Sequence, residues 1–224
     1  MVTFSKEEEV GGVLPPARRA IEASGLDVEF RADLEPHMDP ISAFGYEQGK
    51  ARPIFHPIFD KMPDTGELVR LNGAYLKPPS ERREGRAYPR FDIMQQQTDD
   101  KVRFGDVMVD QTGPHPNETY AHEFRHRGLQ RIRNAISQED FASRYGQDAA
   151  EYLYEGAEEE DFVRSMDPEH VSGHWEGELT EERAATLSKA ITDAALDLIE
   201  DERENATTRK EAVGWLRSIF GKDD

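Results

Sequence analysis

The chain has 224 residues, with 46 acidic and 28 basic side chains and a formal net charge of −18. This charge argues against nucleic acid as a direct partner, because neutralising phosphates requires clustered Lys and Arg that would have to overcome the acidic field. The chain has no cysteine, which excludes disulfides, thiolate metal sites and a cysteine nucleophile. The absence of a membrane-length apolar stretch and of a secretion signal predicts a cytoplasmic protein with no membrane partner.

The first half of the chain predicts strands and few helices. We expect a flexible tail at 1–12, then a short helix that opens at Pro15 and Pro16 and ends at Gly25. Residues 26–31 then alternate as a strand. In the middle of the chain, prolines separate three further strand-like stretches, 67–76, 87–94 and 102–109. Together these stretches predict a small antiparallel or mixed sheet.

The second half predicts mainly helices. One helix is expected from about Glu118, and another after a capping box that begins at Ser137. An acidic helix over 149–166 and a long helix over about 180–204 follow. A sheet followed by helices gives an α+β fold, with a single domain over 13–205. Residues 206–224 predict an amphipathic C-terminal helix that packs on this domain.

Residues 122–126 form an HExxH pentad, with histidines at His122 and His126. On a helix, side chains four residues apart lie on one face, so both imidazoles can bind one metal ion. Glu123 then stands where a general base is needed to take a proton from an activated water. The pentad therefore predicts a zinc hydrolase.

The context of the pentad supports a helix with a strand before it. Breakers at 113–116 end in the N-cap candidate Asn117, and Glu118 then adds negative charge to the first turn. The competing interpretation is a surface helix with solvated histidines, in which Glu123 pairs with Arg127 four residues later. We favour the metal site, because strand followed by motif helix is the order expected of a zincin active site.

A zinc site needs a third protein ligand from farther along the chain. Ile132 excludes a histidine six residues after the pentad, and His170 and His174 are the only later histidines. The acidic helix over 149–166 offers many carboxylates instead.

The chain resembles the HExxH zincins with a glutamate third ligand, including zincin domains of phage-encoded proteins. The resemblance rests on 122–129, with Gly128 and Leu129 after the pentad, and on the Glu-Glu run with apolar residues after it at 159–164. It covers about 100–168. It implies a zincin-like fold, zinc ligands His122, His126 and Glu160, and Glu123 as general base. Other glutamates remain eligible as third ligand: Glu151, Glu155, Glu158 and Glu159.

The function predicted is a metallopeptidase with one zinc ion that hydrolyses peptide bonds in a peptide or protein substrate. The substrate is expected to pair with an edge strand around 107–110. Candidates for stabilising the oxyanion are Tyr152, Tyr154, His170 and His174. The alternative is a non-catalytic structural or host-directed binding protein, possibly phage-derived, in the host cytoplasm or the virion. The charge alone also suits an acidic mimic of nucleic acid.

Overall fold

The structure is a computed structural model that describes residues 34–47, 49–61, 65–78, 102–155, 159–168 and 179–220, with the side chains of the last range described to residue 208. Several predicted elements lie outside these residues: the tail at 1–12, the helix that opens at Pro15, and the strands at 26–31 and 87–94. The described part is mixed, with many helices and a small sheet, in agreement with the predicted α+β class.

A three-stranded mixed sheet precedes the main helices. Its order is β1 (Ala51–Ile54), β5 (Val107–Asp110) and β4 (Gly73–Tyr75), with β5 in the centre. β1 runs parallel to β5, and β4 runs antiparallel to it. Every residue of β5 is buried, as expected for a central strand of Val and Met covered on both faces. The predicted mixed sheet is therefore present, and β4 is one of its edges.

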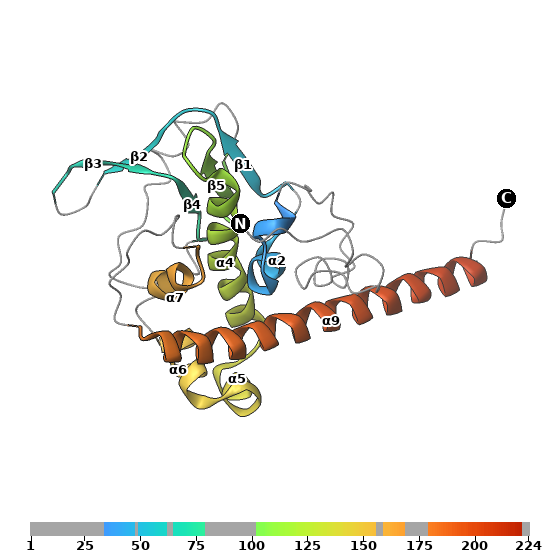
Figure 1. Cartoon of the computed structure of the whole chain (residues 1–224). Coiled ribbons are helices and arrows are strands. Elements are labelled where there is room, and N and C mark those ends of the chain that lie inside the picture. Colours follow the sequence, from blue (N-terminus) through green and yellow to red (C-terminus); the bar gives the residue numbers. More distant parts are fainter. Residues whose placement is uncertain are drawn as a thin grey trace, which may run out of the picture.

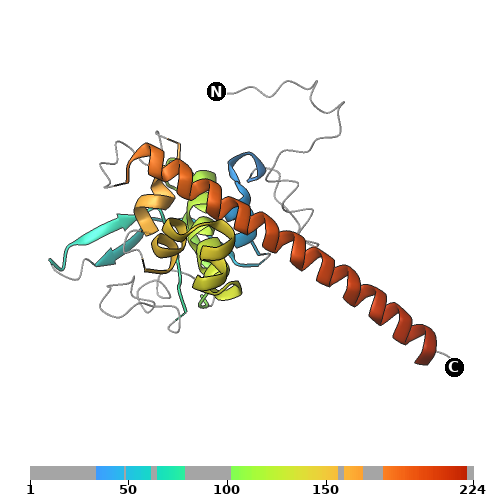
Figure 2. The same ribbon diagram turned by 90° about the horizontal axis from the view of Figure 1, so that it is seen from below.

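A separate two-stranded hairpin stands beside this sheet. It consists of β2 (Ile58–Lys61) and β3 (Leu68–Leu71), and Figures 1 and 2 show it extending from the body of the molecule. The sequence predicts one strand over 67–76, but Asn72 divides this stretch between the hairpin and the sheet. The alternating pattern continues across the break, so it does not reveal that the chain changes partners.

The helix that carries the pentad is α4 (Pro116–Ala135), which runs through the centre of the molecule in Figure 1. Its N-cap is His115, two residues before the predicted Asn117. The reason is Pro116, whose fixed φ and missing N–H suit the first turn of a helix. Tyr120 and Phe124 of α4 pack with β5 residues Val107 and Val109 in one cluster, which sets α4 against the sheet.

Among the described residues, three shorter helices follow α4. In α5 (Gln138–Tyr145), Ser137 is the N-cap as predicted, and its side chain accepts a hydrogen bond from the backbone N–H of Asp140. The acidic helix predicted over 149–166 is instead two helices, α6 (Gln147–Glu155) and α7 (Glu159–Ser165). The break lets α7 lie beside α4, as Figure 1 shows.

The last helix, α9 (Glu181–Phe220), is longer than predicted. The sequence predicts a helix that ends near 204 and a separate one from 206, but the structure has one continuous helix of 40 residues. Its first half supplies buried side chains to the core formed with α4 to α7: Leu187, Ile191, Ala194, Ala195 and Ile199. Its second half extends beyond these helices in both views (Figures 1 and 2). Among the described residues, no helix combines the length and apolar character needed to cross a membrane.

A short 3-10 helix, η2 (Glu35–His37), leads to α2 (Pro40–Gly45), which packs closely on α4. A Cβ atom at Gly128 of α4 would lie 2.2 Å from the backbone oxygen of Ile41, and one at Gly45 would lie 1.9 Å from that of Phe124. Only glycine therefore permits this approach of the two backbones. The crossing fixes α2 against α4, and the two helices lie side by side in Figure 1.

Candidate metal centre

The two histidines of the pentad face one another across one turn of α4. Their Nε2 atoms are 3.3 Å apart, and the rings are 5.0 Å apart between centroids in an edge-to-face arrangement. His126 is 9 % exposed, and His122 is partly buried. A helix that brings side chains at i and i+4 together thus presents two imidazole nitrogens to one point, as the sequence predicts.

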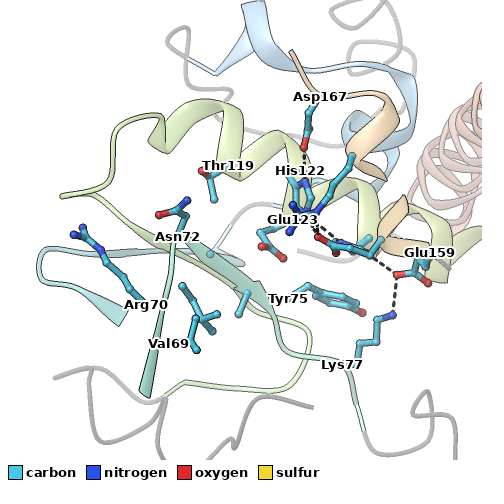
Figure 3. A pocket seen from close by; sticks show the side chains of 16 residues that line it. Val69, Arg70, Asn72, Tyr75, Lys77, Thr119, His122, Glu123, Glu159 and Asp167 are labelled. Carbon is cyan, nitrogen blue, oxygen red and sulfur yellow. Dashed lines mark hydrogen bonds and ion pairs between the residues drawn. The ribbon is translucent and has the colours of Figure 1, made fainter. Parts of the chain in front are cut away.

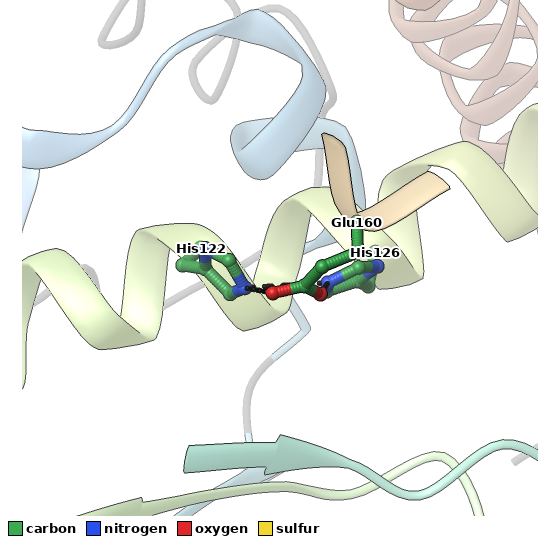
Figure 4. A group of neighbouring side chains, drawn as sticks. All are labelled: His122, His126 and Glu160. Carbon is green, nitrogen blue, oxygen red and sulfur yellow. Dashed lines mark hydrogen bonds and ion pairs between the residues drawn. The ribbon is translucent and has the colours of Figure 1, made fainter. Parts of the chain in front are cut away.

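Glu160 of α7 approaches the same point from the other side (Figure 4). Its Oε2 lies 3.1 Å from Nε2 of His126, and its Oε1 lies 3.7 Å from Nε2 of His122. Donor atoms of these three residues all lie within 4.8 Å of one another. Tetrahedral zinc with bonds of about 2.0–2.1 Å needs donors about 3.3–3.4 Å apart, so the residues present fit a zinc ion.

The far nitrogen of each histidine is hydrogen-bonded to a carboxylate. Nδ1 of His122 lies 2.7 Å from Oδ2 of Asp167, and Nδ1 of His126 lies 2.6 Å from Oε1 of Glu159. When Nδ1 carries the proton, the lone pair of Nε2 is free for a metal, and the carboxylate fixes the orientation of the ring. This pattern is typical of histidines that bind zinc, and both histidines have it.

Glu159 is itself surrounded by cations. Nη1 of Arg133 donates to its Oε2 at 2.5 Å, and Nζ of Lys77 donates to its Oε1 at 2.8 Å. Burial alone would raise the pKa of Glu159, but the hydrogen bond with His126 and the charges of Arg133 and Lys77 hold it well below its usual value. Glu159 therefore remains a carboxylate, which suits an acceptor for the His126 N–H.

The acidic surroundings also change the titration of the ring nitrogens. Burial alone would lower the pKa of His122, but hydrogen bonds to Asp167 and Glu160 and the charge of Glu123 raise it to about 10. The pKa of His126 is raised in the same way, because Glu159 and Glu160 outweigh burial. In metal-free protein near neutral pH, the His122 ring is therefore protonated.

Glu123 lies behind the two histidines and is 8 % exposed. Burial raises its pKa, although the charges of His122 and His126 and a backbone hydrogen bond from Tyr75 act in the opposite direction. A carboxylate whose pKa is raised toward neutrality is a stronger base for accepting a proton. The direction of the pKa shift is the one that a general base requires, and the role of Glu123 as general base stays a prediction.

A cavity of about 520 Å³ opens onto these residues (Figure 3). One wall is the extended segment 69–75 of β3 and β4, and the other is α4 with the residues around α7. Because β5 is the central strand, both of its edges are already paired. The expected substrate strand at 107–110 is therefore wrong. Among the described strands, β4 is at an edge of this sheet and lines the cavity.

The remaining sequence candidates lie elsewhere. Glu155 accepts a hydrogen bond from Gln138, Glu151 accepts one from Gln147, and both are exposed and away from the cavity. Glu158, His170 and His174 lie outside the described residues. Tyr154 donates to the carbonyl of Ile136, and Tyr152 packs on Phe162, so neither lines the cavity.

The surface-helix interpretation requires Arg127 to pair with Glu123, but these two side chains are not in contact. The Arg127 guanidinium donates to the carbonyl of Gly45 and to the carboxylate of Glu47. The arginines of α4 that follow the pentad serve contacts within the protein: Arg131 donates to Glu202 at 2.6 Å and Arg133 to the carbonyl of Leu153 at 2.7 Å. These interactions leave the pentad glutamate facing the cavity.

Sequence reasoning missed Asp167 and Lys77. Neither has a local signature: Asp167 precedes a proline two residues after α7, and Lys77 follows β4. Their roles depend on contacts with residues 45 and 82 positions away in the chain. Glu159, which the sequence offers as a possible third ligand, lies beside His126 but on its far nitrogen.

No protein-family model matches the chain, and comparison with curated proteins and with solved structures finds no significant match either.

Alanine substitutions distinguish the roles of the neighbouring glutamates. Glu160→Ala is expected to weaken zinc binding by more than about 100-fold, because it removes a ligand of the metal. Removing a residue that only hydrogen-bonds to a ligand usually weakens metal binding by about 10–100-fold. Glu159→Ala is expected to fall within that smaller range, and Glu155→Ala is the control with unchanged affinity. Competition with a chromophoric chelator measures all three. An equal loss of zinc affinity in Glu160→Ala and Glu159→Ala would contradict the assignment of Glu160 as the only carboxylate ligand.

Proposed function

We propose that the protein is a zinc-dependent metallopeptidase that hydrolyses peptide bonds, and that its domain is zincin-like. The observation that carries the proposal is the convergence of His122, His126 and Glu160 beside the buried Glu123, with each imidazole oriented by a carboxylate. Zinc bound there would lower the pKa of a water molecule and polarise the carbonyl of the substrate. Two histidines and one glutamate leave a position for that water.

Side chains of the protein would supply the proton transfer. Glu123 accepts a proton from the attacking water and returns it to the amine that leaves. Its burial keeps bulk water from competing for that proton, and the backbone hydrogen bond from Tyr75 holds its carboxylate in place. Arg164 also lines the cavity, where its Nε donates to Oε1 of Glu160 at 2.5 Å.

The edge strand β4 supports a polypeptide as substrate. It pairs with β5 on one side, and the extended segment that contains it forms a wall of the cavity for seven residues, 69–75. An extended peptide can add to such an edge through main-chain hydrogen bonds, which accept many side chains. This mode would place the peptide along β4, in the cavity that Glu123 also lines.

Metal analysis and proteolysis together test this function. Purified protein is expected to contain one zinc per chain and to cleave an unfolded polypeptide, with cleavage abolished by a chelator and restored by added zinc. Zinc content without cleavage would instead favour the structural or binding role. Protein that neither contains nor takes up zinc would overturn the proposal.

Zinc binding is expected to weaken as the pH falls. The raised pKa of about 10 means that His122 is protonated in metal-free protein at neutral pH, whereas a zinc ligand must be neutral. Zinc uptake must therefore displace protons, and the apparent affinity should rise between about pH 6 and about pH 8. Titration calorimetry in buffers with different ionisation enthalpies counts the protons released. Affinity that does not change over this range would contradict the prediction.

A further inference from the structure

Arg125 stands in the middle of the pentad, but unlike the metal donors it does not line the cavity. It is 4 % exposed, and its guanidinium joins two carboxylates. Its Nε donates to Oδ2 of Asp39 at 2.5 Å, and its Nη1 donates to Oδ1 of Asp167. A buried arginine with two carboxylate partners holds both of them in fixed positions, because its donors form a rigid planar fork.

Asp167 connects Arg125 to the metal centre. Its Oδ1 accepts from Arg125, and its Oδ2 lies 2.7 Å from Nδ1 of His122. The side chain is 2 % exposed, so solvent does not take the place of either partner. Both oxygens of the carboxylate are thus committed, one to Arg125 and one to His122. Figure 3 shows the contact between Asp167 and His122.

Asp39 connects Arg125 to the start of α2. Its Oδ1 accepts the backbone N–H of Ile41 at 2.8 Å and that of Ser42 at 3.1 Å, which makes Asp39 the N-cap of α2. Its Oδ2 is left for Arg125. One carboxylate therefore caps a helix and holds the arginine at the same time.

We propose that Arg125 is a positioning residue of the metal centre, and that it holds Asp167 against His122 while Asp39 at the N-terminus of α2 holds Arg125. This inference rests on the metal site of the proposed function but not on hydrolysis. Without the arginine, Asp167 would be a buried carboxylate with one oxygen lacking its partner, and it would be free to turn away from His122. The affinity for metal would fall, because the orientation of a histidine ligand depends on the acceptor at its far nitrogen.

The alternative is that Arg125 only joins α2 to α4 and has no effect on the metal. Arg131 provides a matched control, because it lies on the same helix and also contacts α2, through the carbonyl of Phe44 and the Phe44 ring. It has no contact with Asp167. Arg125→Met and Arg131→Met therefore remove the same charge and a similar contact with α2, but only the first breaks the link to His122.

The test measures the zinc dissociation constant of the full-length variants by competition with a chromophoric chelator. Arg125→Met is expected to weaken zinc binding by about 10-fold or more, whereas Arg131→Met should leave it unchanged. The visible absorption of the cobalt-substituted protein provides a second measurement, and its bands should shift only in Arg125→Met. Thermal unfolding in chelator reports the stability of each metal-free variant separately.

Two further variants keep the test decisive if Arg125→Met does not fold. Asp39→Ser retains a good N-cap for α2 but removes the carboxylate that holds Arg125, so it should weaken zinc binding without a matching loss of stability. Arg125→Lys retains the charge without the planar fork and should recover part of the affinity.

Wild-type affinity in Arg125→Met or in Asp39→Ser would overturn the inference, as would an equal loss of affinity in Arg131→Met. The proposed function fails separately, if the wild-type protein itself binds no zinc.

Discussion

Glu123→Gln is expected to lower the rate of peptide hydrolysis by about 10²–10⁴-fold, the usual contribution of a general base. The amide has nearly the same shape as the carboxylate but cannot accept the proton of the attacking water. Zinc affinity should change little, because Glu123 is not one of the three converging donor residues. The measurements are initial rates on an unfolded polypeptide and metal content after dialysis.

Glu118→Gln is a control on the same helix. Glu118 lies in the first turn of α4 and does not line the cavity, so its loss should leave hydrolysis unchanged. Full activity in Glu123→Gln would refute its assignment as general base. Loss of both zinc and activity would mean that Glu123 also supports the metal ligands, and the rate alone would then not measure proton transfer.

Gly128→Ala is expected to destabilise the protein by about 1–3 kcal/mol, the usual effect of inserting a methyl group into a packed interior. Helix propensity predicts the opposite sign, because alanine stabilises a helix interior by about 1 kcal/mol relative to glycine. Packing should prevail, since the added Cβ would lie 2.2 Å from the backbone oxygen of Ile41, which cannot turn aside like a flexible side chain. Urea unfolding followed by circular dichroism measures the change in the free energy of unfolding.

Gly113→Ala is the corresponding control for the glycine substitution. Its Cβ would meet the backbone oxygen of Asp110 at 3.2 Å, a distance that a small shift relieves. Its stability should therefore stay close to that of the wild type. A gain in stability for Gly128→Ala would show that α2 does not approach α4 as closely as the structure has it. Because α2 also carries Asp39, Gly128→Ala should weaken zinc binding as well.

Features that depend on neighbours in sequence can be predicted from the chain alone. The spacing of His122 and His126 puts them on one face of any helix, whatever surrounds it. The cap at Ser137 is local for the same reason, and the structure has it. The α+β class also follows from the order of strand-like and helical patterns, because each pattern is set by a short stretch of sequence.

Features that depend on pairing across the chain needed the tertiary structure. The pattern over 149–166 fits one helix, and only the packing of α7 on α4 reveals the break that brings Glu160 to the imidazoles and Glu159 to the far nitrogen of His126. The edge position of β4 depends on strand order, which alternation in a sequence does not contain.

The sequence by itself determined the pentad, its helix and the types of residue available to complete a metal site. Only the tertiary structure decided which carboxylate meets each ring nitrogen, that Asp167 and Arg125 link His122 to α2, and which strand lines the cavity. The physical reason is the sequence separation over which each kind of interaction acts. Helix periodicity and capping act over a few residues, whereas these contacts join positions 33 to 86 residues apart, and chain folding alone sets their distances.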